Sequence, residues 1–371
     1  MNLEETSLVI IAVGGTGGHL YPAQVLAEEL MQKRPGIKII FVGHGLQTNR
    51  FFDQQKHTYV DIPSATISLK KLYKLPKACH CIMLGIMQSL KLVSSKKPAL
   101  VIGFGSFHSL PILIAASLSK VPYVLFEANA ILGKVNRLFS KRAYLNAYQL
   151  FHLQTHSGAR FVKTQLPIHE EKLKKIALES ARDYFGLQKQ CFTILIFGGS
   201  QGAVSLNEIV LGALKSCITQ GRVFQVIHLI GFNMDLAAIQ QFYVELGIPA
   251  CVKTHEAHMN YAYSAADLFV GRAGANTIAE GLHHQIPALF VPYPYLDDDH
   301  QTANARYVCD ELQGGIVLSQ KGLTPQLLAT QVQKFFESEY YKQKKESLEK
   351  FKQGKNKKLS EIVLEIVSAR K

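Results

Sequence analysis

The same local pattern occurs twice in this chain, and it limits the fold more than any other feature of the sequence. An apolar run at residues 8–13 leads into Gly14-Gly15-Thr16-Gly17-Gly18, and a second at 192–197 leads into Gly198-Gly199-Ser200-Gln201-Gly202. Gly198 lies 184 residues after Gly14, and apolar residues at helical spacing follow both turns. A buried strand, a glycine turn and an amphipathic helix begin a βαβ unit, so the sequence predicts two doubly wound α/β domains in tandem.

Further apolar runs supply the other strands of both sheets. They lie at residues 37–42, 100–103 and 123–126 in the first half and at 224–230, 268–270 and 288–291 in the second. A length of 371 residues suits two such domains, at about 150 residues or more each. We predict a first domain over residues 1–170, a linker over 171–189, a second domain over 190–338 and a basic helical segment over 339–371.

The charge of the chain is strongly positive and unevenly placed. Lys and Arg number 41 against 28 Asp and Glu, and residues 62–126 contain eight lysines and no acidic residue. This half of the protein is therefore predicted to attract an anionic partner, and charge alone leaves nucleic acid, acidic lipid and a phosphorylated substrate open. The basic run at 342–358 is interpreted as a solvated helix face.

Cysteine usage and the apolar segments indicate a reduced cytosolic protein. The six cysteines form no CxxC pair, and Cys79-His80-Cys81 has no second pair at ligand spacing, so no structural zinc is predicted. The apolar run at 8–13 is too short for a signal peptide. Residues 98–118 are 21 uncharged residues with central glycines and a proline, which favours a strand, a glycine loop and a short helix over a membrane span.

Polar and glycine-rich segments follow the predicted strands, where parallel α/β sheets bind ligands. A third loop, 103–109, follows the strand at 100–103, and Glu127-Ala128-Asn129 follows the next. Neither repeated glycine turn matches the dinucleotide or P-loop spacing. A turn that leads into a helix collects backbone N–H groups at the positive helix end, so two such turns predict phosphate groups bound at a cleft between the domains.

Two blocks in the second half suit a sugar nucleotide. Residues 271–280 follow a strand, and Glu280 offers a carboxylate to ribose hydroxyls. Residues 297–304 follow the next strand with polar side chains for a sugar. The adjacent carboxylates Asp297, Asp298 and Asp299 are interpreted as a solvated turn and helix cap in preference to a metal site.

These segments together resemble the MurG glycosyltransferases. The matching segments are Gly14-Gly15-Thr16-Gly17-Gly18-His19, 103–109, 198–203, 272–280 and His300-Gln301 with Asn304, in order over about residues 8–335. The resemblance implies a GT-B fold, with two Rossmann-like doubly wound domains separated by a deep cleft and C-terminal helices that pack back toward the N-terminal domain.

The resemblance also implies an activity. The implied enzyme is an inverting hexosyltransferase that moves N-acetylglucosamine (GlcNAc) from UDP-GlcNAc to the C4 hydroxyl of the MurNAc-pentapeptide sugar of lipid I. The product is lipid II for peptidoglycan, and hence for cell shape and division. Its expected partners are UDP-GlcNAc, lipid I, the anionic cytoplasmic leaflet and proteins of cell-wall assembly, with no nucleic acid. No cofactor or protein-bound catalytic metal is expected, and the protein is placed peripherally on the cytoplasmic face of the cell membrane.

The site residues carried over from the family fall into three groups. His19 and then Glu127 are the candidates for the base that deprotonates the acceptor, although His19 also suits a phosphate contact or a plain helix start. The acceptor diphosphate is expected at Gly14, Gly15, Gly105 and Ser106. UDP-GlcNAc is expected at Thr16, Gly17, Gly18, Asn129, His169, Ser200, Gln201, Glu256, Ala275, Asn276, Thr277, Ile278, Ala279, Glu280 and Gln301.

The chain departs from the family pattern at several of these positions. Leu166-Pro167-Ile168-His169 replaces an Asn-Pro-x-Arg motif, so a histidine stands where an arginine is usual. Phe107 replaces a common Tyr and Ala128 a common Gln, and His255-Glu256 replaces an apolar pair. Three other functions stay open: a GT-B transferase for another lipid such as diacylglycerol, a UDP-sugar epimerase, and a non-catalytic UDP-sugar-binding protein.

One segment has two interpretations that the sequence does not separate. Residues 75–90 carry apolar side chains near helical spacing, with lysines at both ends. Such a helix suits docking on an anionic membrane surface, and it suits a core helix equally well.

Overall fold

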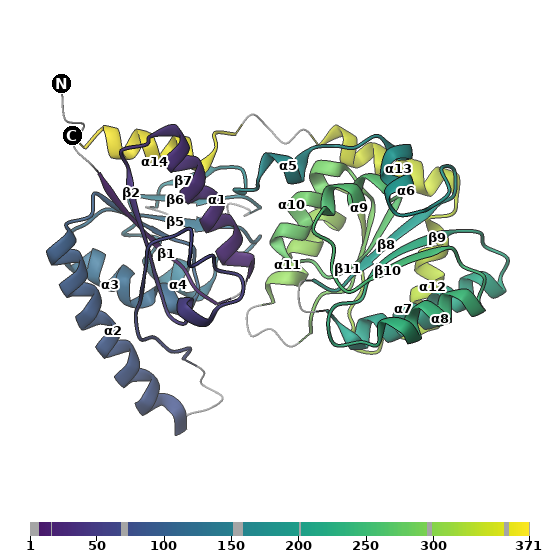
Figure 1. Ribbon diagram of the computed structural model, residues 1–371, viewed down its shortest axis with the longest axis horizontal. Helices are drawn as coiled ribbons and strands as arrows, with labels where there is room; N and C mark the ends of the chain where they lie inside the picture. The colour runs from purple at the N-terminus through teal and green to yellow at the C-terminus, as the bar shows by residue number, and fades with distance from the viewer. Residues whose placement is uncertain are drawn as a thin grey trace. The chain divides into compact units, whose positions relative to one another are not determined.

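The chain folds into two compact units, each built on one parallel sheet (Figure 1). The computed structural model describes residues 7–15, 17–67, 73–150, 159–199, 202–294, 299–351 and 356–370. Unit 1 comprises residues 1–168 and 355–371, and unit 2 comprises 169–354. The predicted class, two doubly wound α/β domains, is confirmed.

Unit 1 contains a seven-stranded sheet in the order β3-β2-β1-β4-β5-β6-β7. All of its pairings are parallel, as in β1 with β2 and β1 with β4. The strands are β1 (Leu8–Ala12), β2 (Lys38–Gly43), β3 (Tyr59–Asp61), β4 (Leu100–Gly103), β5 (Tyr123–Glu127), β6 (Leu145–Tyr148) and β7 (Phe161–Lys163). The order reverses at β1 and β4, and that switch point is where such sheets bind ligands.

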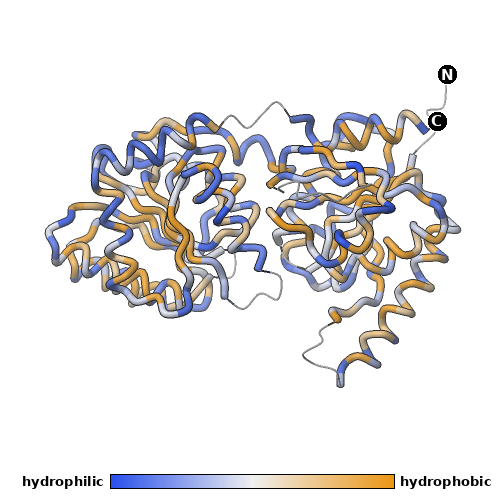
Figure 2. Tube along the Cα trace, turned by 180° about the vertical axis from the view of Figure 1, so that it is seen from behind, coloured by the Kyte–Doolittle hydropathy of each residue, from blue (hydrophilic) through white to orange (hydrophobic). Residues whose placement is uncertain are grey.

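The helices of unit 1 follow from the apolar segments of the sequence. They are α1 (Gly17–Lys33), α2 (Leu75–Lys96), α3 (Leu110–Leu118), α4 (Lys134–Phe139) and α14 (Leu359–Ser368), with 3₁₀ turns at Leu46–Thr48 and Phe107–Ser109. Residues 98–118 form β4, a loop and α3, as predicted. All of β4 is buried, as is β1 apart from its first residue, and hydrophobic segments run through the middle of this unit in Figure 2.

Unit 2 repeats this strand order with six strands, β10-β9-β8-β11-β12-β13. The strands are β8 (Thr193–Phe197), β9 (Gln225–Leu229), β10 (Ala250–Lys253), β11 (Leu268–Gly271), β12 (Ala288–Phe290) and β13 (Gly315–Val317). The helices are α5 (Glu170–Leu173), α6 (Leu178–Tyr184), α7 (Val204–Thr219), α8 (Leu236–Glu245), α9 (Met259–Ala265), α10 (Ala275–His284), α11 (His300–Arg306), α12 (Pro325–Lys334) and α13 (Ser338–Lys350), with a π-helical turn at Tyr307–Glu311. The switch point here lies between β8 and β11.

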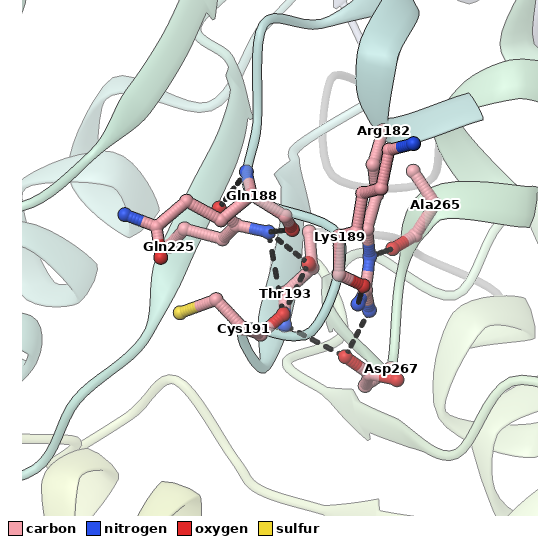
Figure 3. Close-up of polar contacts among 8 residues, drawn as sticks. All are labelled: Arg182, Gln188, Lys189, Cys191, Thr193, Gln225, Ala265 and Asp267. Carbon is pink, nitrogen blue, oxygen red and sulfur yellow. Dashed lines mark hydrogen bonds and ion pairs between the residues drawn. The ribbon is translucent and has the colours of Figure 1, made fainter. Parts of the chain in front are cut away.

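Residues 171–189, for which the sequence suggested a linker, fold as part of unit 2. They contain α5 and α6, and α6 packs against α9. The guanidinium of Arg182 is buried, forms a 2.6 Å ion pair with Asp267 and donates to the carbonyl oxygens of Ala265 and Lys189 (Figure 3). These contacts fix α6 to the sheet because a buried guanidinium has to satisfy its donors within the protein.

The C-terminal helices divide between the two units. The helix α12 begins at the cap Thr324, whose hydroxyl accepts a hydrogen bond from Leu327 N–H, and it packs on α7 in unit 2. The helix α14 packs on α1 in unit 1, where Lys33 pairs with Glu361 at 3.2 Å. The chain thus returns to the N-terminal domain, as the resemblance implied, although α13 stays in unit 2.

Candidate active site

The glycine turn after β1 packs against the loop after β4, because the two strands are hydrogen-bonded neighbours. A Cβ atom on Gly14 would lie 2.4 Å from the Cβ of His108, so a larger residue does not fit at position 14. Gly15 has a φ of +85°, and Gly105 in the facing loop has a φ of +81°. The structure therefore brings together Gly14, Gly15, Gly105 and Ser106, the four residues expected to hold the acceptor diphosphate.

Ser106 holds the β4 loop in an unusual backbone conformation. Its φ of 71° and ψ of 148° lie in a region that non-glycine residues rarely adopt, at a cost of about 1–3 kcal/mol. The Ser106 hydroxyl accepts a hydrogen bond from His108 N–H at 3.3 Å, and the Ser109 hydroxyl donates to the Gly105 carbonyl at 2.7 Å. These bonds compensate for part of the strain and fix the loop in one shape.

The first turn of α1 begins directly at the glycine turn. Gly17 and Gly18 open this helix, and His19 lies half-buried in its first turn. Thr16, also expected near the transferred sugar, lies outside the described residues. Because N–H groups at the start of a helix have no partners inside the helix, this end of α1 suits an anion.

Glu127, the second candidate for the base, is buried at the end of β5 and organises the loop that follows. One carboxylate oxygen accepts the backbone N–H and the side-chain amide of Asn129, at 3.1 and 2.9 Å. The other accepts Gly133 N–H at 2.9 Å and the Asn136 amide at 3.0 Å. Four donors occupy the carboxylate, so in this structure Glu127 positions Asn129 and the start of α4.

In unit 2 the corresponding turn joins β8 to α7. Gly199 has a φ of +92° and Gly202 a φ of +77°. A Cβ on Gly198 would lie 2.3 Å from the Cβ of Ala203. Glycine is therefore favoured at positions 198, 199 and 202. The two predicted diphosphate contacts in this turn, Ser200 and Gln201, fall outside the described residues.

The six residues expected around the nucleotide, Ala275, Asn276, Thr277, Ile278, Ala279 and Glu280, form the first turns of α10. Ile278 and Ala279 are buried in the domain core, so their side chains position the helix. Burial raises the pKa of Glu280, while Lys172 and the neighbouring hydroxyl of Tyr263 act in the opposite direction. A carboxylate fixed beside the start of a helix is suited to accept hydrogen bonds from ribose hydroxyls.

Two buried side chains hold the loops around α10 together. The Arg272 guanidinium donates to the carbonyl oxygens of Val291 and Pro292, at 2.8 and 3.0 Å, and thereby joins the loops after β11 and β12. Burial lowers the pKa of Arg272 to about 10. Asn304 on α11 donates to the Ala273 carbonyl at 3.0 Å.

Gln301 on α11 faces the loop after β12. Its side-chain oxygen accepts Tyr293 N–H at 3.0 Å, which ties the first turn of α11 to this loop. Asp299 stands at the start of this helix. Asp297 and Asp298 are not among the described residues, and the described part of the chain contains no group of three His, Cys, Asp or Glu placed to hold a metal ion.

Glu256 follows β10 and is buried. Its carboxylate accepts hydrogen bonds from the Lys253 ammonium at 2.7 Å, His258 N–H at 2.8 Å and the Tyr184 hydroxyl at 3.3 Å. Burial alone would raise the pKa of Glu256, but these donors together lower it below its usual value. The side chain thus fixes the backbone of the loop that the family resemblance places at the uracil ring.

His169 begins unit 2 and stands immediately before α5. Its neighbours Glu170 and Glu171 lie in the first turn of that short helix, where acidic side chains are favourable. The described residues therefore place His169 in a structured turn at the start of the second unit.

Comparison with known proteins agrees with this arrangement. The models of the glycosyltransferase family 28 N-terminal and C-terminal domains match residues 9–146 and 193–360. A protein of Protochlamydia amoebophila (strain UWE25) is 34% identical over 87% of this chain and 86% of its own length. It is named UDP-N-acetylglucosamine--N-acetylmuramyl-(pentapeptide) pyrophosphoryl-undecaprenol N-acetylglucosamine transferase, as is a Chlamydia muridarum protein that is 33% identical over 89% of this chain and 90% of its own length.

The chain belongs to glycosyltransferase family 28. Among solved structures, Acinetobacter baumannii MurG superposes with a TM-score of 0.78 at 26% identity and covers 98% of this chain and 99% of its own. Os79 from O. sativa in complex with UDP superposes with a TM-score of 0.70 at 10% identity over 99% of this chain and 100% of its own, which shows the shared fold alone. The family assignment and the two-domain glycosyltransferase fold are thereby confirmed.

Sequence reasoning missed three residues of this family-28 chain that the structure places just after the carboxyl ends of strands. Arg272 and His108 were visible only as members of their motifs, and no pattern showed that Arg272 would join two loops. His44 follows β2, and its ring packs against that of His108 with centroids 5.6 Å apart. Its position after a predicted strand was the only available signal.

Proposed function

We propose that this glycosyltransferase moves GlcNAc from UDP-GlcNAc to the C4 hydroxyl of the MurNAc-pentapeptide sugar of lipid I and so forms lipid II for peptidoglycan. The observation that carries this proposal is the match to the two relatives that bear that name, along nearly the whole chain. The two glycine turns, one at each switch point, are consistent with a diphosphate on each substrate.

Unit 2 is proposed to hold the donor. The Glu280 carboxylate on α10 would accept the ribose hydroxyls, and the loop fixed by Glu256 would contact the uracil through its backbone. Ser200 and Gln201 would contact the diphosphate, and Gln301 the transferred sugar, with His169 at the position of the usual arginine. This assignment is supported by α10 and α11, which the Arg272 and Asn304 contacts hold together.

Unit 1 is proposed to hold the acceptor. The lipid diphosphate would lie on the turn at Gly14 and Gly15 and on the loop at Gly105 and Ser106. Thr16, Gly17, Gly18 and Asn129 would approach the transferred sugar. Of the two candidates for the base we favour His19, because the Glu127 carboxylate already accepts four hydrogen bonds within the protein.

The proposed reaction is a single in-line displacement at the anomeric carbon. The acceptor C4 oxygen forms the new bond with inversion, its proton passes to the base, and UDP leaves from the opposite face. Negative charge grows on the leaving diphosphate, and the N–H groups at the start of α7 are suited to stabilise it. The proposal calls on no cofactor.

Helix α2 supports a peripheral position on an anionic membrane. Among the described residues it is the one helix long and apolar enough to cross a bilayer, yet Ala78, Ile82 and Val93 lie buried against unit 1. Met83 and Met87 are each 62% exposed. A helix with a buried face, an outward apolar face and lysines at both ends is typical of docking on a leaflet.

The decisive experiment follows labelled GlcNAc from UDP-GlcNAc to a short-chain lipid I analogue, alongside a diacylglycerol acceptor and a reaction without acceptor. We expect a lipid II-like product and UDP release only with lipid I. Transfer to diacylglycerol would assign another lipid acceptor, and isomerised donor without acceptor would indicate an epimerase. UDP binding without turnover would identify a non-catalytic binding protein.

Two variants test the finer assignments. His19→Ala is expected to lower turnover at least about tenfold while UDP affinity is kept, and unchanged turnover would reject His19 as the base. Met83→Gln with Met87→Gln is expected to weaken binding to acidic vesicles without changing transfer to a water-soluble acceptor. Vesicle binding that is indifferent to salt and lipid charge would exclude the docking role.

A further inference from the structure

Three histidines from different segments meet at the ligand-binding edge of unit 1. His108 belongs to the loop after β4, His44 follows β2, and His19 lies on α1. The rings of His44 and His108 pack edge to face, with centroids 5.6 Å apart and planes at 88°. The strands β2, β1 and β4 are consecutive in the sheet, so all three segments lie at one edge.

The ring of His108 lies directly against the glycine turn. A Cβ on Gly14 would lie 2.8 Å from His108 Nδ1, and one on Gly15 would lie 3.9 Å from the same atom. This nitrogen is shielded from solvent and has no hydrogen-bond partner within the described part of the chain. Because an unpaired buried polar atom is costly, an anionic oxygen at this turn would be stabilised by a hydrogen bond from His108 Nδ1.

The surroundings of His108 disfavour its charged form. Burial, then His44 and His19, lower the pKa of His108, and the Asp61 carboxylate acts in the opposite direction. Asp61 lies 3.6 Å from His44 Nδ1, but it already accepts hydrogen bonds from Gly45 N–H and Gln47 N–H. Among the described residues, His44, His19 and Asp61 are the charged and titratable groups that act on His108.

We propose that His44 and His108, together with His19, form a proton-linked anion site that takes up protons as it binds the diphosphate of a lipid-linked substrate. A diphosphate beside the imidazoles favours their charged forms. By linkage, whatever favours protonation also favours binding of the anion. This inference rests on the proposed function for the identity of the ligand, and it adds the groups that supply the positive charge.

The test measures binding of geranyl diphosphate, a short prenyl diphosphate, to the full chain. Saturating UDP is present to occupy the anion site of unit 2. Calorimetry in two buffers of different ionisation enthalpy counts the protons taken up. We expect uptake near neutral pH and an affinity that falls roughly tenfold between about pH 6 and about pH 8.

Two variants and one matched control identify the source of the protons. His44→Gln alters an exposed side chain, so the variant is expected to fold normally. His108→Asn keeps a polar side chain but removes the imidazole that takes up a proton. Each is expected to reduce proton uptake and to flatten the pH dependence. His80→Gln, an exposed histidine on α2, is expected to leave both unchanged.

The inference is overturned if wild-type protein does not bind the probe or binds it without proton uptake. It is also overturned if the protein that combines His44→Gln with His108→Asn retains full uptake. Inorganic pyrophosphate in a parallel titration distinguishes the sources, and equal His-dependent affinity for it would assign the site to a free diphosphate. Failure of the proposed function gives a different result, namely no transfer to lipid I while His-dependent probe binding persists.

Discussion

The buried ion pair between Arg182 and Asp267 gives the sharpest stability prediction. Arg182→Met removes the 2.6 Å pair and the two bonds to the carbonyl oxygens of Ala265 and Lys189. Asp267 stays largely buried and keeps the hydrogen bond from Thr193 N–H at 2.7 Å (Figure 3). Loss of one partner of a buried pair typically costs about 3–5 kcal/mol, and we expect a loss of this size in unit 2.

The sign of the pH dependence follows from Asp267. Burial raises the pKa of Asp267 in the folded protein, although Thr193 N–H and Arg182 act against it. Without Arg182 the folded pKa rises further above the unfolded value, so the folded state binds the extra proton and stability falls as pH rises through that window. The cost of Arg182→Met is therefore larger at about pH 8 than at about pH 5.

The assay is urea unfolding followed by far-ultraviolet circular dichroism, since the chain has no Trp. Hydrogen exchange on peptides of unit 2 assigns the transition to that unit. Lys189→Gln is the matched control, because it removes exposed ion pairs with Glu179 and Asp183 but keeps the backbone carbonyl that Arg182 uses. A loss below about 1 kcal/mol for Arg182→Met, or one equal at both pH values, would refute the reasoning.

Three further predictions concern unit 2. Gly271→Ala places a methyl group 2.1 Å from the Phe197 carbonyl oxygen. The free energy of unfolding measured in urea is therefore expected to fall by about 1–3 kcal/mol, and a variant as stable as the wild type would contradict this. A methyl group added at Gly281, inside α10, would meet no atom within 4 Å. Gly281→Ala is therefore expected to stabilise the folded protein by about 0.5–1 kcal/mol without changing its affinity for UDP. Thermal unfolding with and without UDP checks both expectations. The folded protein holds the pKa of Glu256 below its usual value. The ionised carboxylate therefore stabilises the folded state above the usual pKa, and this stabilisation is lost as the pH falls and the group is protonated. Glu256→Gln should therefore flatten the acid unfolding profile, and an unchanged profile would show that its contacts add no stability.

The amino-acid sequence by itself determined the fold class and the position of the glycine turns. Apolar runs bounded by glycine predict buried parallel strands, and the observed β1, β4 and β8 lie within a residue or two of the predicted runs. The cap at Thr324 and the apolar face of α14 likewise depend only on residues close in sequence. The repeated turn was sufficient to predict two similar sheets.

Only the tertiary structure decided which distant residues meet. No local pattern shows that Arg182 belongs to unit 2, because its partner Asp267 lies 85 residues further along the chain. The sequence left the helix at 75–90 open between core and surface, whereas α2 buries one face and exposes Met83 and Met87. Burial depends on what the fold places against each face, and periodicity alone does not give that.

The two candidate bases show the same division. The sequence placed Glu127 and His19 after two different predicted strands, where either is chemically suited to the task. Tertiary contacts then gave Glu127 four donors and brought His44 and His108 into one group with His19. Local sequence sets which side chains reach the ligand-binding edge of a sheet, but the order of the strands decides which of them become neighbours.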